Sequence, residues 1–212
     1  MQIDSTRYME YIAAVAQKIE ESKAYITELD SATGDGDHWA NMNMGFQKLV
    51  QSREELEKLS ISDCFKKIGM IIMSTVGGSS GVLYGSAYLK ASKAVGSAAA
   101  LDLPLLCGAL DAELQAIMER GNARPGFKTM IDSLAPAVEA MKVALARGDD
   151  DTKVLAAMKR GAIDGMNSTK NMEAVKGRAS YQTDKGVGHL DPGAVTMCYQ
   201  LETLADYLCG RG

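Results

Sequence analysis

Apolar residues recur at helical spacing along nearly all of the 212 residues, and this pattern limits the fold more than any other feature. No segment shows sustained alternation at period two with many valine, isoleucine and threonine residues, and the chain has only 4 prolines. The pattern therefore predicts an all-α fold. The clearest example is the stretch 8–29, whose helical face consists of Tyr8, Tyr11, Ile12, Val15, Ile19, Ile26 and Leu29.

About eight helices are expected. The first is long, has Ser5 as its N-cap and stops in an acidic, glycine-containing loop. The second runs through 42–50, with the same periodicity reaching Leu56, and the third ends at Gly77. Glycine-rich stretches are short, and no change of composition marks a boundary, so the chain is predicted to be one domain over 1–212. The remaining helices are predicted over 82–95, 103–119, 129–146, 152–172 and 193–209.

Composition excludes several classes of protein. Hydrophobic residues make up 46% and charged residues 24%, which is typical of a globular chain with a core. The net charge of −4, without any run of lysine and arginine, argues against nucleic-acid binding. The 4 cysteines are scattered, so we expect reduced thiols rather than a zinc site. Charged residues near the start and the lack of a long apolar stretch predict a cytoplasmic protein without membrane segments.

Three aspartates, Asp30, Asp35 and Asp37, lie close together in the acidic loop. Neighbouring carboxylates repel one another unless water or a metal ion neutralises them. Mg²⁺ is the natural candidate, because it takes one or two carboxylates and completes its octahedron with water and phosphate oxygens. A solvated acidic turn explains the spacing equally well, so the loop alone leaves both interpretations open.

Two further segments are candidates for binding a phosphate group, and two other positions have a structural interpretation. The stretch 77–81 can present backbone N–H groups at the start of a helix, although a flexible turn between helices is the alternative. Near the C-terminus, Arg178 can clamp a phosphate oxygen or remain a solvated charge. Asp191 and Pro192 are typical of a helix start, as N-cap and first turn. His38 can ligate a metal, pack on a base or begin a helix, and the sequence does not rank these roles.

Two familiar motifs are nearly matched and are rejected. The acidic loop begins like an EF-hand, but Trp39, Ala40 and Phe46 stand at positions where that loop requires other residues. The stretch 121–129 is similar to a Walker A loop, yet Phe127 separates its second glycine from the lysine and no buried strand precedes it.

Taken together, motifs along nearly the whole chain closely resemble the nucleotide-binding L subunits of bacterial dihydroxyacetone kinases. Several motifs in the same order are far more specific than any one of them. They are Leu-Asp at 29–30, Gly-Asp-Gly-Asp-His at 34–38, Asn-Met-Asn at 41–43, Gly-Phe at 45–46, Gly-Gly at 77–78, Lys-Thr-Met at 128–130, Gly-Arg-Ala-Ser-Tyr at 177–181, Gly-His at 188–189 and Asp-Pro-Gly-Ala at 191–194.

The resemblance implies an antiparallel eight-helix barrel that holds an adenine nucleotide and two Mg²⁺ ions at one end. Asp30, Asp35 and Asp37 would be the metal ligands. Ser79 and Ser80 would face phosphate, with Met130 near the base, and no separate catalytic residue is assigned. The residues implied to line the nucleotide site are His38, Trp39, Ala40, Asn41, Ser79, Ser80, Gly121, Met130, Arg178, Asp191, Pro192 and Gly193.

The resemblance also implies partners. In this family a K subunit binds dihydroxyacetone, so this chain would donate a phosphoryl group to a substrate held elsewhere. In the phosphoenolpyruvate-dependent systems, a phosphohistidine on the M subunit of the phosphotransferase system recharges the retained ADP to ATP. Association of two copies as a homodimer is left open.

Three residues depart from the family pattern and keep alternatives open. Trp39 stands where glycine is usual, Met44 where arginine is common, and Phe127 where aspartate is usual. They put the partner and the final substrate in question, so a kinase subunit for another small ketose or polyol is one alternative. A nucleotide-bound regulatory module that docks on a transcription factor is the other.

Overall fold

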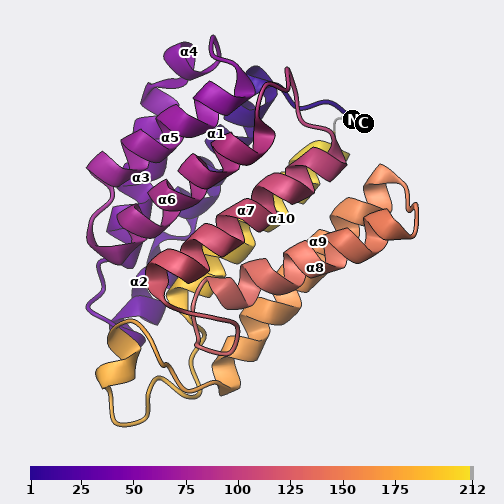
Figure 1. Cartoon of the computed structure of the whole chain (residues 1–212). Helices are drawn as coiled ribbons and strands as arrows, with labels where there is room; N and C mark the ends of the chain where they lie inside the picture. Colours follow the sequence, from indigo (N-terminus) through magenta and orange to yellow (C-terminus); the bar gives the residue numbers. More distant parts are fainter. Residues whose placement is uncertain (211–212) are drawn as a thin grey trace. The chain divides into compact units, whose positions relative to one another are not determined.

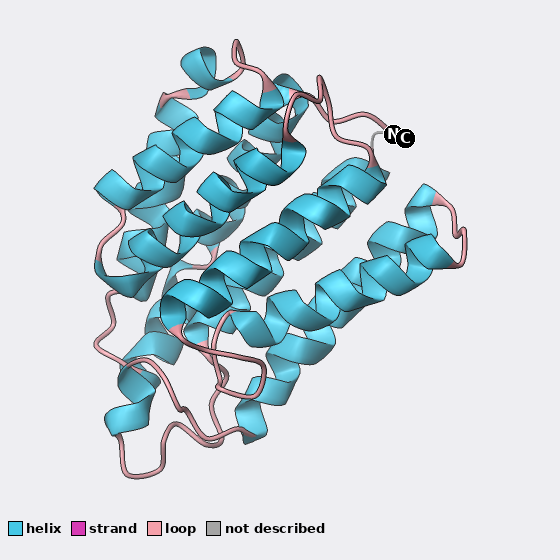
Figure 2. Cartoon of the chain, in the orientation of Figure 1, coloured by secondary structure: helices cyan, strands magenta, loops and turns pink. Residues whose placement is uncertain are grey.

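The computed structural model describes residues 1–210, and every regular element in that range is helical (Figure 2). The β pairing in that range is one isolated bridge between Ile3 and Leu101. The all-α prediction is therefore confirmed. The elements are α1 (Ser5–Glu21), α2 (Lys23–Thr33), α3 (His38–Gln51), α4 (Arg53–Leu56), α5 (Ile61–Thr75), α6 (Gly78–Val95), α7 (Leu103–Gly121), α8 (Ile131–Ala146), α9 (Asp151–Ser168), the 3-10 turns η1 (Thr169–Asn171) and η2 (Arg178–Tyr181), and α10 (Pro192–Cys209).

The predicted helices overlap these elements, but several boundaries differ. The expected first helix is interrupted at Ser22, whose backbone (φ −92°, ψ 11°) leaves helical geometry and separates α1 from α2. The periodicity that reached Leu56 belongs to the separate single turn α4. The helix expected to reach residue 172 ends at Ser168 and continues as η1. Hydrophobic periodicity does not reveal such breaks, because the apolar face continues across them.

The chain divides into two compact units, and each combines stretches that are far apart in the sequence. Of the described residues, the first unit contains 1–17 and 41–122, and the second contains 18–40 and 123–210. Because the chain passes from one unit to the other more than once, no single cut separates them. This explains why composition shows no boundary between domains.

The first unit contains a close helical hairpin. Only Val76 and Gly77 join α5 to α6, so these helices run antiparallel, and α6 packs in turn on α7 (Figure 1). A Cβ atom at Gly69 of α5 would lie 2.9 Å from the carbonyl oxygen of Gly85 on α6. Glycine at both positions therefore lets the two backbones approach closely.

A buried aromatic cluster fills part of this unit. The hydroxyl groups of Tyr8 and Tyr88 are 3.0 Å apart, and the rings of Tyr8 and Phe65 have centroids 4.7 Å apart. Burial raises the pKa of Tyr88, and the neighbouring carboxyl of Glu113 on α7 raises it further. Burial also raises the pKa of Glu113 itself to about 8. The acid is therefore neutral in the folded protein at pH 7.

This protonated carboxyl makes stability depend on pH. Between about pH 4.5 and 8 the folded chain holds a proton that the unfolded chain has lost, so the free energy of unfolding falls as pH rises through this range. Glu113→Gln keeps a neutral side chain and removes the titration. Between pH 5 and 8, urea unfolding should show the wild type losing about 3 to 4 kcal/mol more of its free energy of unfolding than E113Q. The control Glu119→Gln, on the same helix, should lose stability between pH 5 and 8 as the wild type does. If the free energy of unfolding depended on pH equally in the wild type and in E113Q, Glu113 would not be the group responsible.

The second unit is built around α8, α9 and α10. The first two form a hairpin closed by residues 147–150, and α10 packs on both, while α2 packs on α10 (Figure 1). Inside the hairpin, the buried hydroxyl of Ser133 donates a hydrogen bond to the carbonyl of Ala162, at 3.0 Å. Within residues 1–210, no helix combines the length and apolar character needed to cross a membrane.

Candidate functional site

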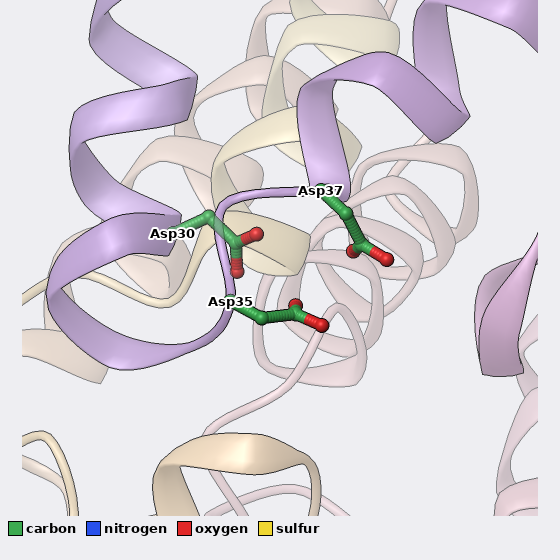
Figure 3. A group of neighbouring side chains, drawn as sticks. All are labelled: Asp30, Asp35 and Asp37. Atoms are coloured by element: carbon green, nitrogen blue, oxygen red, sulfur yellow. The ribbon is translucent and has the colours of Figure 1, made fainter.

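The three aspartates of the acidic loop converge in the second unit. Asp30 lies near the end of α2, Asp35 in the connecting loop and Asp37 immediately before α3, and Figure 3 shows their carboxylates gathered around a common space. One oxygen from each lies within 4.8 Å of the other two. Across residues 1–210, no other trio of histidine, cysteine, aspartate or glutamate side chains comes together in this way. The grouping that the sequence predicted is therefore present.

Local backbone structure holds these carboxylates in place. The buried Asp30 accepts a hydrogen bond at Oδ2 from the backbone N–H of His38, at 2.9 Å, and so caps the start of α3. Gly34 has no room for a side chain, because a Cβ there would collide with the Asp30 carboxylate. The loop then turns at Gly36, whose φ of +79° is a left-handed conformation that favours glycine.

The charge and chemistry of this trio fit a hard cation. Arg178 Nη2 lies 2.5 Å from Asp35 Oδ2, and this exposed pair neutralises at most one of the three negative charges. The remaining carboxylates offer only oxygen donors, which are the ligands that Mg²⁺ prefers. Asp35 and Asp37 are exposed, so water and phosphate oxygens can complete the coordination sphere.

The structure gives His38 a defined role. Its Nε2 lies 2.9 Å from the hydroxyl of Thr196 on α10, and the Pro192 backbone also forms a hydrogen bond with the histidine. Burial lowers the pKa of His38, while Asp30 and Asp37 raise it. His38 is also the first residue of α3. Of the roles left open by the sequence, helix start is thus confirmed, and the ring connects the acidic loop to the start of α10.

The start of α10 has the predicted form. Asp191 is the N-cap and its Oδ2 accepts a hydrogen bond from the backbone N–H of Ala194, at 2.8 Å, while Pro192 occupies the first turn. Burial raises the pKa of Asp191 to about 7, and the bond from Ala194 and the charge of Lys128 lower it. The N-terminus of this helix lies in the same unit as the three aspartates of the acidic loop.

Met130 adjoins this turn. A Cβ at Gly193 would lie 3.6 Å from the Met130 nitrogen and 3.8 Å from its Cβ, so the two segments are in contact. Met130 is buried and precedes α8. The predicted site residues Met130, Asp191, Pro192 and Gly193 are therefore neighbours, and Arg178 and Asp35 meet separately through their ion pair.

Four other predicted site residues, all within 41–122, belong to the first unit. Asn41 lies on α3, close to Gly77, where a Cβ would be 2.8 Å from its Oδ1. Ser79 and Ser80 lie in the first turn of α6, which begins at Gly78 and so includes the 78–81 stretch that the prediction of a helix over 82–95 left out. Gly121 is the last residue of α7, before the left-handed Asn122.

The three departures from the family pattern have distinct surroundings. Trp39 donates its indole N–H to the carbonyl of Ile19, at 3.0 Å, and Lys23 lies over its ring. Met44 is 48% exposed on α3, and the Phe127 ring lies beside Arg124. Ala40, the remaining predicted contact, is exposed on the first turn of α3.

Sequence reasoning missed three residues that hold the site together: Lys128, Thr169 and Thr196. Lys128 was visible as part of the Lys-Thr-Met motif, but nothing in the sequence assigned it a role. Thr169 and Thr196 lie within helical stretches and carry no local signal. Only long-range hydrogen bonds reveal them, to His189, Asp191 and His38.

Known proteins share both the sequence and the fold. The DAK2 domain model matches residues 32–206. The ADP-binding subunit of the PTS-dependent dihydroxyacetone kinase of Lactococcus lactis is 39% identical, over 96% of this chain and 97% of its own length. The corresponding subunit of the PEP-dependent kinase of Escherichia coli is 33% identical over 97% and 98%. Human triokinase/FMN cyclase is 31% identical over 94% of this chain, which spans 34% of that protein.

A solved structure confirms the fold. The crystal structure of the dihydroxyacetone kinase of C. freundii aligns with a TM-score of 0.73 at 23% identity, over 93% of this chain and 34% of its own. A second structure of that kinase, in complex with AMP-PNP and Mg²⁺, aligns with a TM-score of 0.72. With the identity of the full-length bacterial relatives above 30%, the chain belongs to the DAK2 domain family, alongside the ADP-binding subunits of bacterial dihydroxyacetone kinases.

Proposed function

We propose that this chain is the nucleotide-binding subunit of a multi-subunit dihydroxyacetone kinase and that residues 1–212 act as one nucleotide-binding domain. It would hold ADP or ATP with two Mg²⁺ ions and deliver the terminal phosphoryl group to dihydroxyacetone on a partner subunit. The observation that carries this proposal is the convergence of Asp30, Asp35 and Asp37, with Arg178 paired at its edge, in a chain that matches ADP-binding subunits along their whole length.

The candidate site residues of the second unit would each contribute to such a phosphoryl transfer. The aspartates would hold the metal ions, which neutralise phosphate charge when bound. Arg178, 65% exposed, can exchange its contact with Asp35 for a phosphate oxygen without crossing a buried environment. The Asp191 turn and Met130 would hold the rest of the nucleotide. Positioning and charge neutralisation are the main contributions that proteins make to phosphoryl transfer.

The proposal includes two partners and a cytoplasmic location. A ketone-binding K subunit would present dihydroxyacetone, and a phosphohistidine M subunit of the phosphotransferase system would recharge the retained nucleotide. The names of the bacterial relatives support this, because they describe ADP-binding subunits of PTS-dependent or PEP-dependent kinases. The nucleotide would then serve as a coenzyme that stays bound through successive turnovers.

The proposal predicts that protein purified gently with Mg²⁺ carries ADP at close to one molecule per chain. Mass spectrometry of the nucleotide released by denaturation checks this. Reconstitution with K and M subunits of a phosphoenolpyruvate-dependent system should then transfer phosphate from phosphoenolpyruvate to dihydroxyacetone. An empty site that also fails to bind added ADP and Mg²⁺ would contradict the proposal.

A second candidate substrate is favoured by the departures from the family pattern. Met44 is 48% exposed at a position where the family resemblance leads us to expect arginine, and such a change alters the chemistry of the surface offered to a partner. In the reconstituted system, turnover of another small ketose or polyol without turnover of dihydroxyacetone would favour this alternative.

A further inference from the structure

Lys128 is the most deeply buried cation of the second unit. It is 1% exposed, in contrast to the exposed lysines of the surface ion pairs, and it has a left-handed backbone with φ of +59°. Burying an ammonium group is costly unless its donors are satisfied. Here Nζ donates to the carbonyl of Thr169 and to the carbonyl of His189, each at 2.6 Å. The two hydrogen bonds therefore form even though they require a left-handed backbone at Lys128 and burial of its charge, both of which cost free energy.

The two contacts connect three separate segments of the chain. Lys128 lies two residues before Met130, Thr169 begins η1 after α9, and His189 lies two residues before Asp191. Thr169 is fully buried and extends the connection, because its hydroxyl accepts a hydrogen bond from the backbone N–H of Asp191, at 3.1 Å, and donates one to the carbonyl of Met166, at 2.7 Å.

The surroundings keep the ammonium in this position. A Cβ at Gly186 would lie 3.4 Å from Cε of Lys128, so the aliphatic stem runs against the 186–189 loop. Asp132 anchors the preceding segment, since its carboxylate accepts hydrogen bonds from the backbone N–H groups of Gly126 and Thr129, at 2.5 and 2.7 Å. Burial lowers the pKa of Lys128, and the carboxylates of Asp191, Asp184 and Asp132 raise it.

We infer that Lys128 is a positioning residue for nucleotide binding: its ammonium fixes the spacing between Met130 on one side and the turn at 191–193 on the other. This rests on the proposed function, in which both segments line the nucleotide site. Lys128 acts through these loops and does not itself touch phosphate, because its side chain is buried and two of its three donors are engaged by carbonyl groups. A preformed spacing lowers the entropic cost of binding and slows release of the ligand.

Lys128→Met tests this inference, since it keeps the stem and removes the ammonium. The full-length variant should release ADP about 10- to 100-fold faster than the wild type. With the reconstituted partners and phosphoenolpyruvate as the phosphate donor, the concentration of added ADP that half-saturates transfer should rise about 10-fold, while kcat at saturating ADP stays within about threefold of the wild type. The matched control is Ser133→Ala, which removes another buried hydrogen bond to a backbone carbonyl in the same unit and should release ADP within about twofold of the wild type.

A second variant covers the case in which K128M does not fold. Thr169→Val keeps the side-chain shape and removes the hydroxyl that holds Asp191, so it should also accelerate ADP release, by about 10-fold. Release rates of K128M or T169V equal to that of S133A would overturn the inference. A fall in kcat at saturating ADP with unchanged release would do so as well, because it would place Lys128 in the transfer step. If the wild type does not bind ADP, the proposed function fails. If the wild type binds ADP but K128M and T169V release it no faster than S133A, only the positioning role is rejected.

Discussion

Replacing Asp37 with asparagine should weaken Mg²⁺-dependent ADP binding on the order of 100-fold, because a metal ion contributes several kcal/mol of charge stabilisation and each 1.4 kcal/mol is tenfold in affinity. Asp37 is the most selective test of the trio. Asp30 also caps the backbone of His38, and Asp35 also pairs with Arg178, so changing either would disturb a second interaction.

The measurement is calorimetric titration of ADP with and without Mg²⁺. The wild type should show strong dependence on the metal, and D37N should lose most of it while keeping its helical circular dichroism. Asp164→Asn is the matched control, since it makes the same chemical change at an exposed position on α9, outside the acidic loop. Equal Mg²⁺ dependence in D37N and the wild type would show that the trio does not hold the metal.

Replacing Arg178 with lysine should lower the rate of phosphoryl transfer in the reconstituted complex on the order of 100-fold, since lysine keeps the charge and loses the planar fork that fits phosphate oxygens. Arg178→Gln, which removes the charge too, should lose at least as much. Both variants also break the ion pair with Asp35, but that pair is exposed and contributes little to stability.

Transfer from phosphoenolpyruvate to dihydroxyacetone measures this effect, and the thermal unfolding midpoint confirms that the fold is unchanged. Lys170→Gln provides the control, because it removes a positive charge from an exposed side chain on η1 and should leave transfer near the wild-type rate. Transfer by R178K at the wild-type rate would contradict a role for the Arg178 guanidinium in phosphoryl transfer and leave it only the surface ion pair with Asp35.

Sequence reasoning identified most helices because their apolar faces are long and regular. The interruption at Ser22 was not visible, since Ile19 and Ile26 keep helical spacing on either side of it. The cap at Asp191 with Pro192 was visible, because capping depends on residues adjacent in the sequence. A helix cap can therefore be predicted from neighbouring residues in the sequence, whereas an interruption within a continuous apolar face cannot.

The candidate site shows the same division. The acidic trio was predictable because the three aspartates lie within eight positions of one another, from 30 to 37, and a loop that short must keep their carboxylates near each other. The partner of Asp35 was not predictable, because Arg178 is far along the chain and was equally compatible with a solvated charge. The same holds for His38, whose ring could be assigned only when Thr196 was seen beside it.

By itself, the sequence predicted an all-helical chain, a cluster of three neighbouring carboxylates and a capped helix at Asp191, all of which follow from residues close together in the chain. Only the tertiary structure decided that Lys128, Thr169 and His189 form one connection and that Arg178 pairs with Asp35. These contacts join positions dozens of residues apart. Their geometry depends on how the helices pack, and packing is a property of the whole chain rather than of any one segment.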